Sequence, residues 1–437
     1  MNTDDEHLLS AFLMDFLILN IIVIAFIPII SCLFSSIIHL TEIKPNQMKK
    51  RVVRYLKHVI VTLLVLLVTG ASTLHYLNGS LNYGQNPIAY TLDNEGPYVF
   101  YENDSILSIS YLKGTRTNGF FVQSDSCNIK KKTSLSCYFP LDNSSFNFEL
   151  NHTIKPPKST YSTGRKVLAI SDIESGFKTF RDFLIRNNVI NEKLEWIFND
   201  NHLVLVGDFV DRGNSTTQVL WFIYMLEQKA KQYGGNVHFI IGNHELYNLQ
   251  GQYKSSEKKY YAIASILGKL PYQLYNNNSF LGRWLASKNS IELINGTLFT
   301  HGGIHPEIAK TSISIDEINA INRKHYFKPY FPKPKKTVEQ LITSNKKGVC
   351  WYRGYFKNEL TQDEVEKGLN NFNAKSIVVG HTLQSKVKKL YKGKVYAIDV
   401  VHPKDYINSW PNRKSEGLLI EGEKYYRVFH NGKVEQL

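Results

Sequence analysis

The chain has 437 residues and a formal net charge of +14, a length that allows more than one domain and a large core. Because the basic residues are dispersed except for two local clusters, the charge does not indicate a nucleic-acid-binding protein, and we expect no nucleic-acid partner. The four cysteines form neither a disulfide framework nor a CxxC metal pattern.

Two apolar segments come first in the chain, residues 16–38 and 59–77. The first is long enough to cross a hydrocarbon core of about 30 Å, and the second is nearly as long. Residues 44–58 between them carry Lys and Arg but no acidic residue, whereas the N-terminus is acidic, so we expect this loop to be cytoplasmic. Residues 1–81 are therefore predicted to be a membrane anchor in the bacterial inner membrane, with the rest of the chain in the periplasm. The alternative, buried core helices, would require helices that are apolar on all faces.

The same region is also compatible with a secretory signal that begins at Met48. The sequence there reads MKKRVVRYLKH and then VIVTLLVLLVTGAS, which gives a basic start, an apolar stretch and a small-residue ending. Translation from Met1 and translation from Met48 both stay open. Either start exports the C-terminal part, so the predicted localisation does not depend on the choice.

Residues 82–162 contain short alternating runs, such as YVFY, ILSISYL and FNFEL, separated by Asn, Asp, Gly and Ser. This pattern predicts a small antiparallel β-sandwich domain, which we interpret as a spacer or docking surface. Outside the cytoplasm Cys127 and Cys137 could form a disulfide, and the bonded and free forms stay as alternatives. The two prolines of KPPKST at 155–160 predict an extended linker to the next domain.

Two short apolar runs further on, Leu203–Val206 and Val237–Ile241, each end in a polar cluster. Buried parallel strands deliver polar side chains to loops at their carboxyl edge in this way. The clusters read GDFVDRG at 207–213 and GNHE at 242–245. Carboxylate and amide oxygens together with an imidazole are the ligands expected for Mn, Fe or Zn, and they differ from the ligands of a soft thiolate site. These donors are Asp208, Asp211, Asn243 and His244.

GDFVDRG and GNHE at this spacing resemble the second and third motifs of the calcineurin-like metallophosphoesterase superfamily, phosphoprotein-phosphatase type. Together with the preceding β-rich region, VVGHT and WYRG, they resemble the bacterial Shewanella-like phosphatases over residues 95–400 or so. The resemblance implies an α/β fold, a four-layer α/β/β/α metallophosphoesterase sandwich over residues 163–437. It also implies two divalent metal ions, which we expect to be Mn, with Fe, Zn or Mg as alternatives.

The resemblance also implies roles for individual residues. The expected metal ligands, with Asp208 as the bridge between the two ions, are Asp172, Glu174, Asp208, Asn243, His301 and His381. His244 is expected to act as the general acid, because imidazole exchanges a proton near neutral pH, and Glu245 is expected to fix that imidazole. The expected catalytic residues are His244, Asp211 and Arg212, and the expected contacts to the substrate phosphate are Arg212, Arg353, Asn243 and His244.

Glu174 is the main departure from the family pattern, whose first motif is Asp-x-His-Gly. Glu174 takes the place of the His, and Ser175 takes the place of the Gly. If Glu174 is a ligand, its added charge favours hard cations such as Mn or Mg. The alternative is that Glu174 points away and the site holds one metal. In addition, Ile241 stands where the protein-phosphatase branch often has Arg, and no second His follows His381.

A Pro-rich, aromatic and basic segment, residues 323–336, is followed by NKKGVCWYRGYF at 345–356. Beside an active site such a segment predicts a lid that recruits an anionic substrate, although a solvated charge run is the commoner origin of such lysines. The expected function is hydrolysis of phosphomonoesters, with phosphoproteins as one substrate class. The alternatives are a small-molecule phosphomonoesterase or pyrophosphatase of the cell envelope and a weakly active docking protein with this fold.

Overall fold

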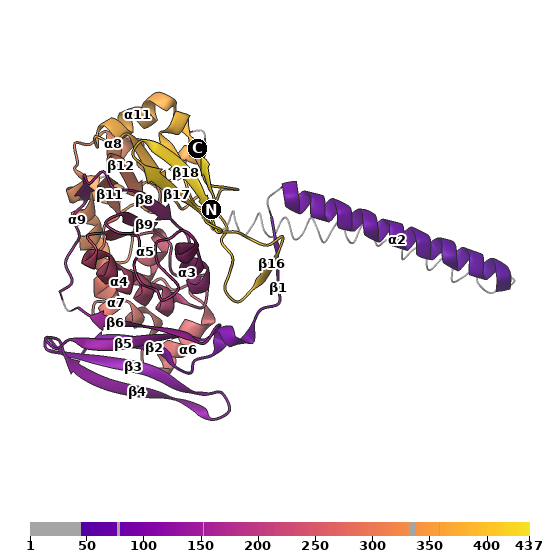
Figure 1. The fold of residues 1–437 in the computed structure, drawn as a ribbon, viewed down its shortest axis with the longest axis horizontal. Coiled ribbons are helices and arrows are strands. Elements are labelled where there is room, and N and C mark those ends of the chain that lie inside the picture. Colours follow the sequence, from indigo (N-terminus) through magenta and orange to yellow (C-terminus); the bar gives the residue numbers. More distant parts are fainter. Residues whose placement is uncertain (1–44, 77–78, 152, 332–336, 358) are drawn as a thin grey trace. The chain divides into compact units, whose positions relative to one another are not determined.

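The computed structural model describes residues 45–76, 79–151, 153–331, 337–357 and 359–437. The chain divides into two compact units, Met1–Gly79 and Ser80–Leu437 (Figure 1). The first predicted apolar segment, residues 16–38, lies outside the described residues, and so does Leu77 at the end of the second.

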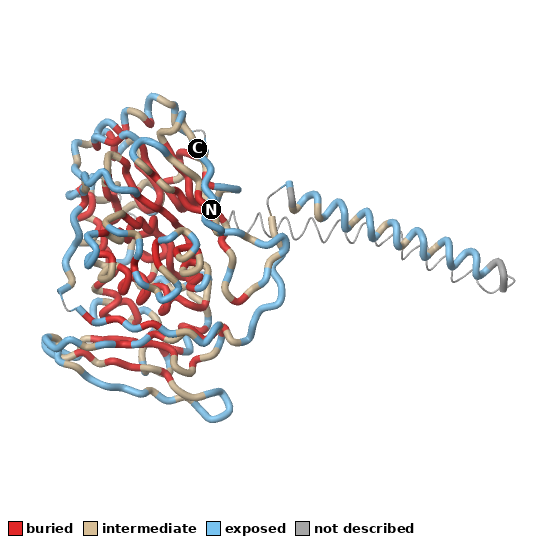
Figure 2. Tube along the Cα trace, in the orientation of Figure 1, coloured by how far each residue is buried: buried red, intermediate tan, exposed pale blue. Residues whose placement is uncertain are grey.

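Helix α2, Pro45–Tyr76, is the described element of the first unit. Proline favours a helix start, because its missing N–H would have no intrahelical partner in the first turn. The stretch Met48–Leu74 is long and apolar enough to cross a membrane, and it is the one such helix in the described part of the chain. Figure 2 shows this helix exposed along its length. A signal sequence passes the same test, so the helix alone is weak evidence for an anchor.

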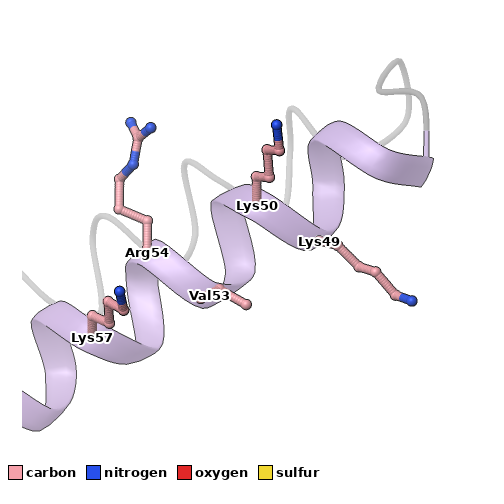
Figure 3. Close-up of a pocket in the computed structure, with 5 residues that line it drawn as sticks. All are labelled: Lys49, Lys50, Val53, Arg54 and Lys57. Carbon is pink, nitrogen blue, oxygen red and sulfur yellow. The ribbon is translucent and has the colours of Figure 1, made fainter.

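The basic segment that was expected to be a loop between two spans is helical from Pro45 onward. Residues 45–58 contain no glycine and, after the first position, no proline, so nothing in them interrupts the helix. Lys50, Arg54 and Lys57 lie on one side of α2, as their i, i+4 and i+7 spacing requires (Figure 3). The predicted cytoplasmic loop is therefore corrected to the first turns of a helix whose later turns are apolar.

The second unit contains two six-stranded sheets. The first has the strand order β10-β9-β8-β17-β18-β19, and the second has the order β14-β15-β13-β12-β11-β7. The strands of the first are β8 Val167–Ile170, β9 His202–Val206, β10 Asn236–Ile240, β17 Glu416–Glu421, β18 Lys424–Phe429 and β19 Val434–Gln436. Those of the second are β7 Thr160–Tyr161, β11 Ile291–Ile294, β12 Thr297–Thr300, β13 Ser376–Val379, β14 Lys388–Leu390 and β15 Val395–Ala397. Within the sheets β8, β9 and β10 are parallel to one another, and so are β12, β13 and β15.

The two sheets pack on each other through a shared apolar core. Val204 and Val206 of β9 and Val378 of β13 are fully buried in it. Strands buried on both faces read as unbroken apolar runs, which explains HLVLV and SIVV. Helices cover the outer faces (Figure 1), so the predicted mixed α/β class is confirmed. They are α3 Phe177–Arg186 and α4 Thr216–Gln232 on the first sheet and α8 Pro306–Ala309, α9 Ile315–His325 and α11 Gln362–Asn370 on the second.

The remaining helices are short connections around these layers. Three of them, α5, α6 and α7, follow β10 in the chain, and α10 lies between α9 and α11. Their bounds are α5 Asn243–Leu249, α6 Lys258–Ile266, α7 Phe280–Ala286 and α10 Val338–Ile342. The start of the unit is tied to its C-terminal part, because β1, Leu81–Tyr83, pairs antiparallel with β16, Asn408–Trp410.

The β-rich region forms two antiparallel sheets that lie against α4 (Figure 1). Trp221 of α4 stacks on Phe148 with ring centroids 4.6 Å apart, and its indole N–H donates to the carbonyl of Pro97 at 2.8 Å. The strands share one apolar core with the helices, so the structure does not confirm a separate β-sandwich domain. The strands are β2 Glu95–Tyr101, β3 Ile106–Thr115 and β4 Gly119–Asn128 in one sheet and β5 Thr133–Phe139 and β6 Ser144–Leu150 in the other.

The two cysteines of this region are free thiols. Cys127 lies opposite Leu107 in the three-stranded sheet, whereas Cys137 lies opposite Phe146 in the other sheet, where it is fully buried. The two side chains therefore belong to different layers of the fold. Of the two forms left open above, the structure has the free one.

Candidate active site

The candidate site lies where the parallel strands of both sheets end. Asp172, Asp208 and His381 each stand two residues past the end of a strand, namely β8, β9 and β13. Asn243 stands three residues past the end of β10, and His301 directly follows β12. Asp172, Asp208 and His381 have left-handed backbone angles, with φ of 54°, 57° and 64°. Such conformations are uncommon for residues other than glycine and cluster at functional sites.

Three of the expected ligands form a compact buried group. Asp208, His301 and His381 each offer one ligand atom within 4.8 Å of the others. His301 Nε2 lies 3.0 Å from Asp208 Oδ2 and 3.1 Å from Asn243 Oδ1. His301 Nδ1 lies 2.8 Å from the carbonyl of Val206, which makes Nδ1 the protonated nitrogen and leaves Nε2 as a ligand atom.

Asp172 and the surrounding glycines complete this pocket. An oxygen of Asp172 accepts a hydrogen bond from the backbone N–H of His381 at 3.3 Å. A Cβ on Gly207 would stand 2.6 Å from His301 Nδ1, and one on Gly380 would stand 2.6 Å from an oxygen of Asp172. Only glycine allows these backbones to approach the donor atoms so closely.

The electrostatics of this group suit divalent cations. Burial raises the pKa of Asp208, but His301 and His244 outweigh that effect and hold the pKa well below its usual range. Burial lowers the pKa of His301, and Asp208 and Asp172 raise it again to about 10. For Asp172 burial dominates and raises the pKa well above its ordinary value. Oxygen and imidazole donors packed so closely, with acids this desolvated, fit divalent metal ions.

His244 is oriented by Asp211. His244 Nδ1 lies 2.8 Å from Asp211 Oδ2, and Asp211 also accepts from Asn248 Nδ2 at 2.9 Å and from Ser256 Oγ at 2.8 Å. His244 Nε2 then faces the donor group, 3.9 Å from Asp208 Oδ2. Burial lowers the pKa of His244, but the charge of Asp208 and the hydrogen bond to Asp211 raise it overall.

The expected role of Glu245 is wrong. Its carboxylate accepts from the backbone N–H groups of Gly242, Asp208 and Phe209 at 2.8 to 2.9 Å and does not contact the imidazole. Glu245 therefore ties the two motif loops together, while Asp211 is the residue that holds His244. Burial and the neighbouring Asp208 raise the pKa of Glu245 to about 7.

Glu174 contacts Arg212 rather than the compact ligand group. One of its oxygens forms an ion pair with Arg212 Nη1, and the other lies 3.9 Å from Lys404 Nζ. Lys404 Nζ also donates to the carbonyl of Arg212 at 3.2 Å. Of the two alternatives for Glu174, this contact favours the one in which it points away from the metal. The other expected phosphate ligand, Arg353, is half-buried, with Nη2 3.4 Å from His381 Nδ1.

Several residues of the site were not expected from the sequence. Asn248 and Ser256 hold Asp211, and Asp399, two residues past the end of β15, is 7% exposed. Tyr247 and Trp351 form an aromatic pair with centroids 5.2 Å apart, and they contact His244 and His381 respectively. An apolar run followed by Asp, VYAIDV, is the signal that could have identified Asp399. Nothing comparable marks the other residues.

Part of the predicted lid is packed against the rest of the unit, whereas Phe331 is 73% exposed. Tyr326 is 1% exposed, and Arg323 donates to Asn289 Oδ1 at 2.6 Å. The backbone N–H groups of Gly302 and Gly303 both donate to the carbonyl of Val349, so the second segment is fixed beside His301. Residues 332–336 lie outside the described residues.

Two packed sheets with a buried cluster of oxygen and imidazole donors at their carboxyl edge define a metallophosphoesterase. The calcineurin-like phosphoesterase family model matches residues 165–385, so the chain belongs to this family and is a phosphoesterase hydrolase. Phosphorylated compounds are accordingly its class of substrate.

Relatives and solved structures agree with this membership. The chain is 28% identical over 230 residues to an uncharacterized protein of Schizosaccharomyces pombe, a match that covers 50% of this chain and 67% of that protein. It is 28% identical over 236 residues to Shewanella-like protein phosphatase 1 of Plasmodium berghei, covering 50% and 61%. The crystal structure of a cold-active protein-tyrosine phosphatase of a psychrophilic Shewanella species is similar over 78% of this chain and 99% of that one, with a TM-score of 0.69 and 29% identity.

Proposed function

We propose that the chain is a metal-dependent phosphomonoesterase that acts on phosphoproteins. The observation that carries this proposal is the His244–Asp211 pair, whose free imidazole nitrogen faces the buried group of Asp208, His301 and His381. The group would hold two divalent cations, with Asn243 and Asp172 as further ligands and Asp208 as the bridge. We expect Mn, because carboxylate and amide oxygens outnumber imidazoles in this set.

The chain's own residues supply the remaining chemistry. Bound cations provide Lewis-acid activation of water and neutralise the phosphoryl oxygens. Arg212 and Arg353 orient the phosphate through charged N–H donors. As the bond from phosphorus to the leaving oxygen breaks and water oxygen bonds to phosphorus, His244 Nε2 gives its proton to the leaving oxygen. Asp211 keeps the imidazole in the required orientation and stabilises its protonated form.

An aryl phosphate, phosphotyrosine above all, is the substrate that the surroundings of the site favour. Tyr247 and Trp351 are half-buried and stand beside His244 and His381. Aromatic side chains at this place suit a flat leaving group by edge or face contacts. The likeness to a Shewanella protein-tyrosine phosphatase supports the same substrate class.

We further propose that α2 attaches the enzyme to the bacterial inner membrane with the catalytic part in the periplasm. The apolar stretch Met48–Leu74 and the basic residues at its start support this orientation. A reporter fused after Leu437 should be active only outside the cytoplasm. A reporter that is active only inside would overturn the orientation.

The substrate proposal is tested on the full chain purified in detergent. Initial rates with Mn are measured on a phosphotyrosine peptide, a phosphoserine peptide, a nucleoside monophosphate and pyrophosphate, with a chelator control. We expect the phosphotyrosine peptide to be hydrolysed fastest and the chelator to abolish turnover. Faster hydrolysis of pyrophosphate or the nucleotide would make the protein a small-molecule enzyme, and bound metal without turnover would make it a docking protein.

A further inference from the structure

Strand β15 ends at the site, but none of the expected metal ligands follows it. β13 and β15 are parallel neighbours, and Val379 pairs with Ala397 at their carboxyl ends. His381 stands two residues after the first strand, and Asp399 stands two residues after the second. The same offset places Asp172 after β8 and Asp208 after β9. Because parallel strands bring their ends to one edge, Asp399 occupies the position of a ligand in this arrangement.

The backbone around Asp399 is fixed, while its carboxylate has no partner. The N–H of Ile398 donates to the carbonyl of Val379, and the carbonyl of Asp399 accepts from the N–H of Gln384, both at 2.9 Å. The residue is 7% exposed, and no described residue forms a hydrogen bond or ion pair with its side chain. A buried carboxylate without a partner is costly, so it is expected to be neutralised or to bind a cation.

The neighbours of Asp399 show where its side chain lies. Asp399 is the strongest charged influence on Asp172, whose pKa it raises, and it is itself influenced by Glu174 and His301. It is also the strongest acidic influence on Arg353. These influences agree with the place of Asp399 after β15, next to the strand that His381 follows.

Glu174 leaves a place in the donor set open. Its carboxylate is engaged by Arg212 and Lys404, so one donor fewer surrounds Asp172 than the resemblance implies. Asp399 follows a strand of the other six-stranded sheet and carries the same type of donor. Two buried hydroxyls, Ser171 Oγ and Thr382 Oγ1, lie next to Asp172 and His381 in the chain and have no hydrogen-bond partner among the described residues.

We infer that Asp399 is a metal ligand of this site and provides, next to Asp172, the donor that Glu174 does not. The inference rests on the proposed metal-dependent function and goes beyond it, because it concerns a residue outside all of the family-like motifs of the chain. A carboxylate in this place adds to the hard oxygen donors of the site.

Metal stoichiometry tests the inference. The full chain in detergent is stripped with a chelator and titrated with Mn, and bound metal is measured by equilibrium dialysis with elemental analysis. The variants are Asp399→Asn, Asp399→Ala and Glu174→Gln, and Asp405→Asn is the matched control. Asp405 accepts from the N–H groups of Lys178 and Thr179 at the start of α3, so it is an acid with a structural task.

We expect two ions in the wild type, in Glu174→Gln and in Asp405→Asn, and an affinity for one ion that is at least 10-fold weaker in both Asp399 variants. Wild-type affinities in Asp399→Asn and Asp399→Ala would overturn the inference while leaving the proposed function intact. If the wild type binds one ion, weakening of that ion by Asp399→Asn still supports the ligand role and retires the two-metal site. If it binds none, the proposed function and the inference both fail.

Thermal unfolding separates a ligand role from a structural one. Without metal, Asp399→Asn should unfold at a higher temperature than the wild type, because it removes an unpaired buried charge beside Asp172. With saturating Mn it should gain less than the wild type does. Asp405→Asn should be less stable than the wild type in both conditions, with an unchanged gain from Mn. The same behaviour in Asp399→Asn would assign it a structural role and overturn the inference.

Discussion

The two ends of β9 and β10 carry the same types of buried side chain, yet only one end has the features of an active site. At the amino end, His202 Nδ1 lies 2.7 Å from His238 Nε2, and His238 Nδ1 lies 2.6 Å from Glu292 Oε2. Thr163 and Asn289 close this chain at its two ends, at 2.7 and 2.9 Å. Every ring nitrogen of His202 and His238 and both carboxylate oxygens of Glu292 therefore have a protein partner.

The carboxyl end of the same strands is organised differently. Asp208, His301 and His381 converge on one another with ligand atoms within 4.8 Å, and the buried hydroxyls of Ser171 and Thr382 beside the group have no partner among the described residues. Burial alone does not separate the two ends, because His202 and His301 are both fully buried. The arrangement separates them: groups paired in a line rigidify a fold, whereas carboxylate and imidazole donors that converge on one place, with unpaired hydroxyls beside them, suit a bound ion.

The largest expected effect is at the carboxyl end. Asp208→Ala should lower kcat/KM by at least about 10³-fold, because the bridging donor is lost together with its support for His244. Without metal the fold should persist, since Asp208 is a loop residue and adds little packing. Activity on p-nitrophenyl phosphate, bound metal and the unfolding temperature are the measurements. Wild-type metal content and rate would refute the assigned centre.

His244→Asn tests the acid role with a leaving-group series. We expect a loss of about 10²- to 10⁴-fold on an alkyl phosphate and a much smaller loss on p-nitrophenyl phosphate, whose leaving group barely needs a proton. The slope of rate against leaving-group pKa should steepen. An equal loss on both substrates would remove His244 from the acid role. Asn248→Ala, which loosens Asp211, should show the same trend in weaker form.

The sequence alone identified residues whose motif stands directly after a buried apolar strand and itself contains the polar side chains. The structure brings Asp208, Asp211, Asn243 and His244 of GDFVDRG and GNHE close together, because each motif follows a buried strand. Asp399 follows a strand as well, but no glycine stands beside it in IDVV to mark a loop with chemistry.

Other features depend on contacts between distant parts of the chain. Glu174 and Arg212 are 38 residues apart, and nothing in either motif shows that the two side chains meet. In the β-rich region, alternation predicted strands with one buried face, but it does not tell what covers that face. Phe146 and Phe148 meet Phe222 and Trp221 of α4 rather than a second sheet, so the strands were predicted and the sandwich was not confirmed.

The hydrogen-bonded residues at the amino end, His202, His238 and Glu292, should control stability rather than activity. Burial lowers the pKa of His202 to about 4, from 6.5 in the unfolded chain. Below pH 6.5 the unfolded state binds a proton that the folded state does not accept until about pH 4, so stability falls as the pH falls through this window. The loss is about 2–3 kcal/mol at pH 4.

His202→Asn tests this prediction. The variant should show a flatter decline of unfolding free energy between pH 6.5 and 4, with kcat/KM near wild type at pH 7.5 or so. His402 is buried, and its pKa is also lowered to about 4. Its contribution to the pH dependence of the unfolding free energy stays in the variant and serves as an internal reference. An unchanged pH slope, or a large loss of activity, would contradict the division between the two ends.

The smallest effect is expected at Glu174, which lies at the carboxyl end but is paired like the residues at the amino end. Glu174 belongs to a strand end of the site, yet it is paired, since Arg212 and Lys404 both contact it. Its pair with Arg212 occupies Nη1 and leaves the other guanidinium N–H groups for a phosphate. Glu174→Gln removes the charge that holds this arginine, so KM should rise about 10-fold with kcat changed little, equivalent to about 1.4 kcal/mol of phosphate binding.

Asp182→Asn is the matched control, because Asp182 is an acid paired with Lys178 and Arg181 on α3, outside the site. It should leave KM and metal content unchanged. If Glu174→Gln instead loses a metal ion at unchanged KM, Glu174 is a ligand after all, and Glu174→His should then restore that ion with a preference shifted toward Zn or Fe. If KM rises and both ions stay, a carboxylate that sequence alone would place on the metal acts on the phosphate side, by holding Arg212.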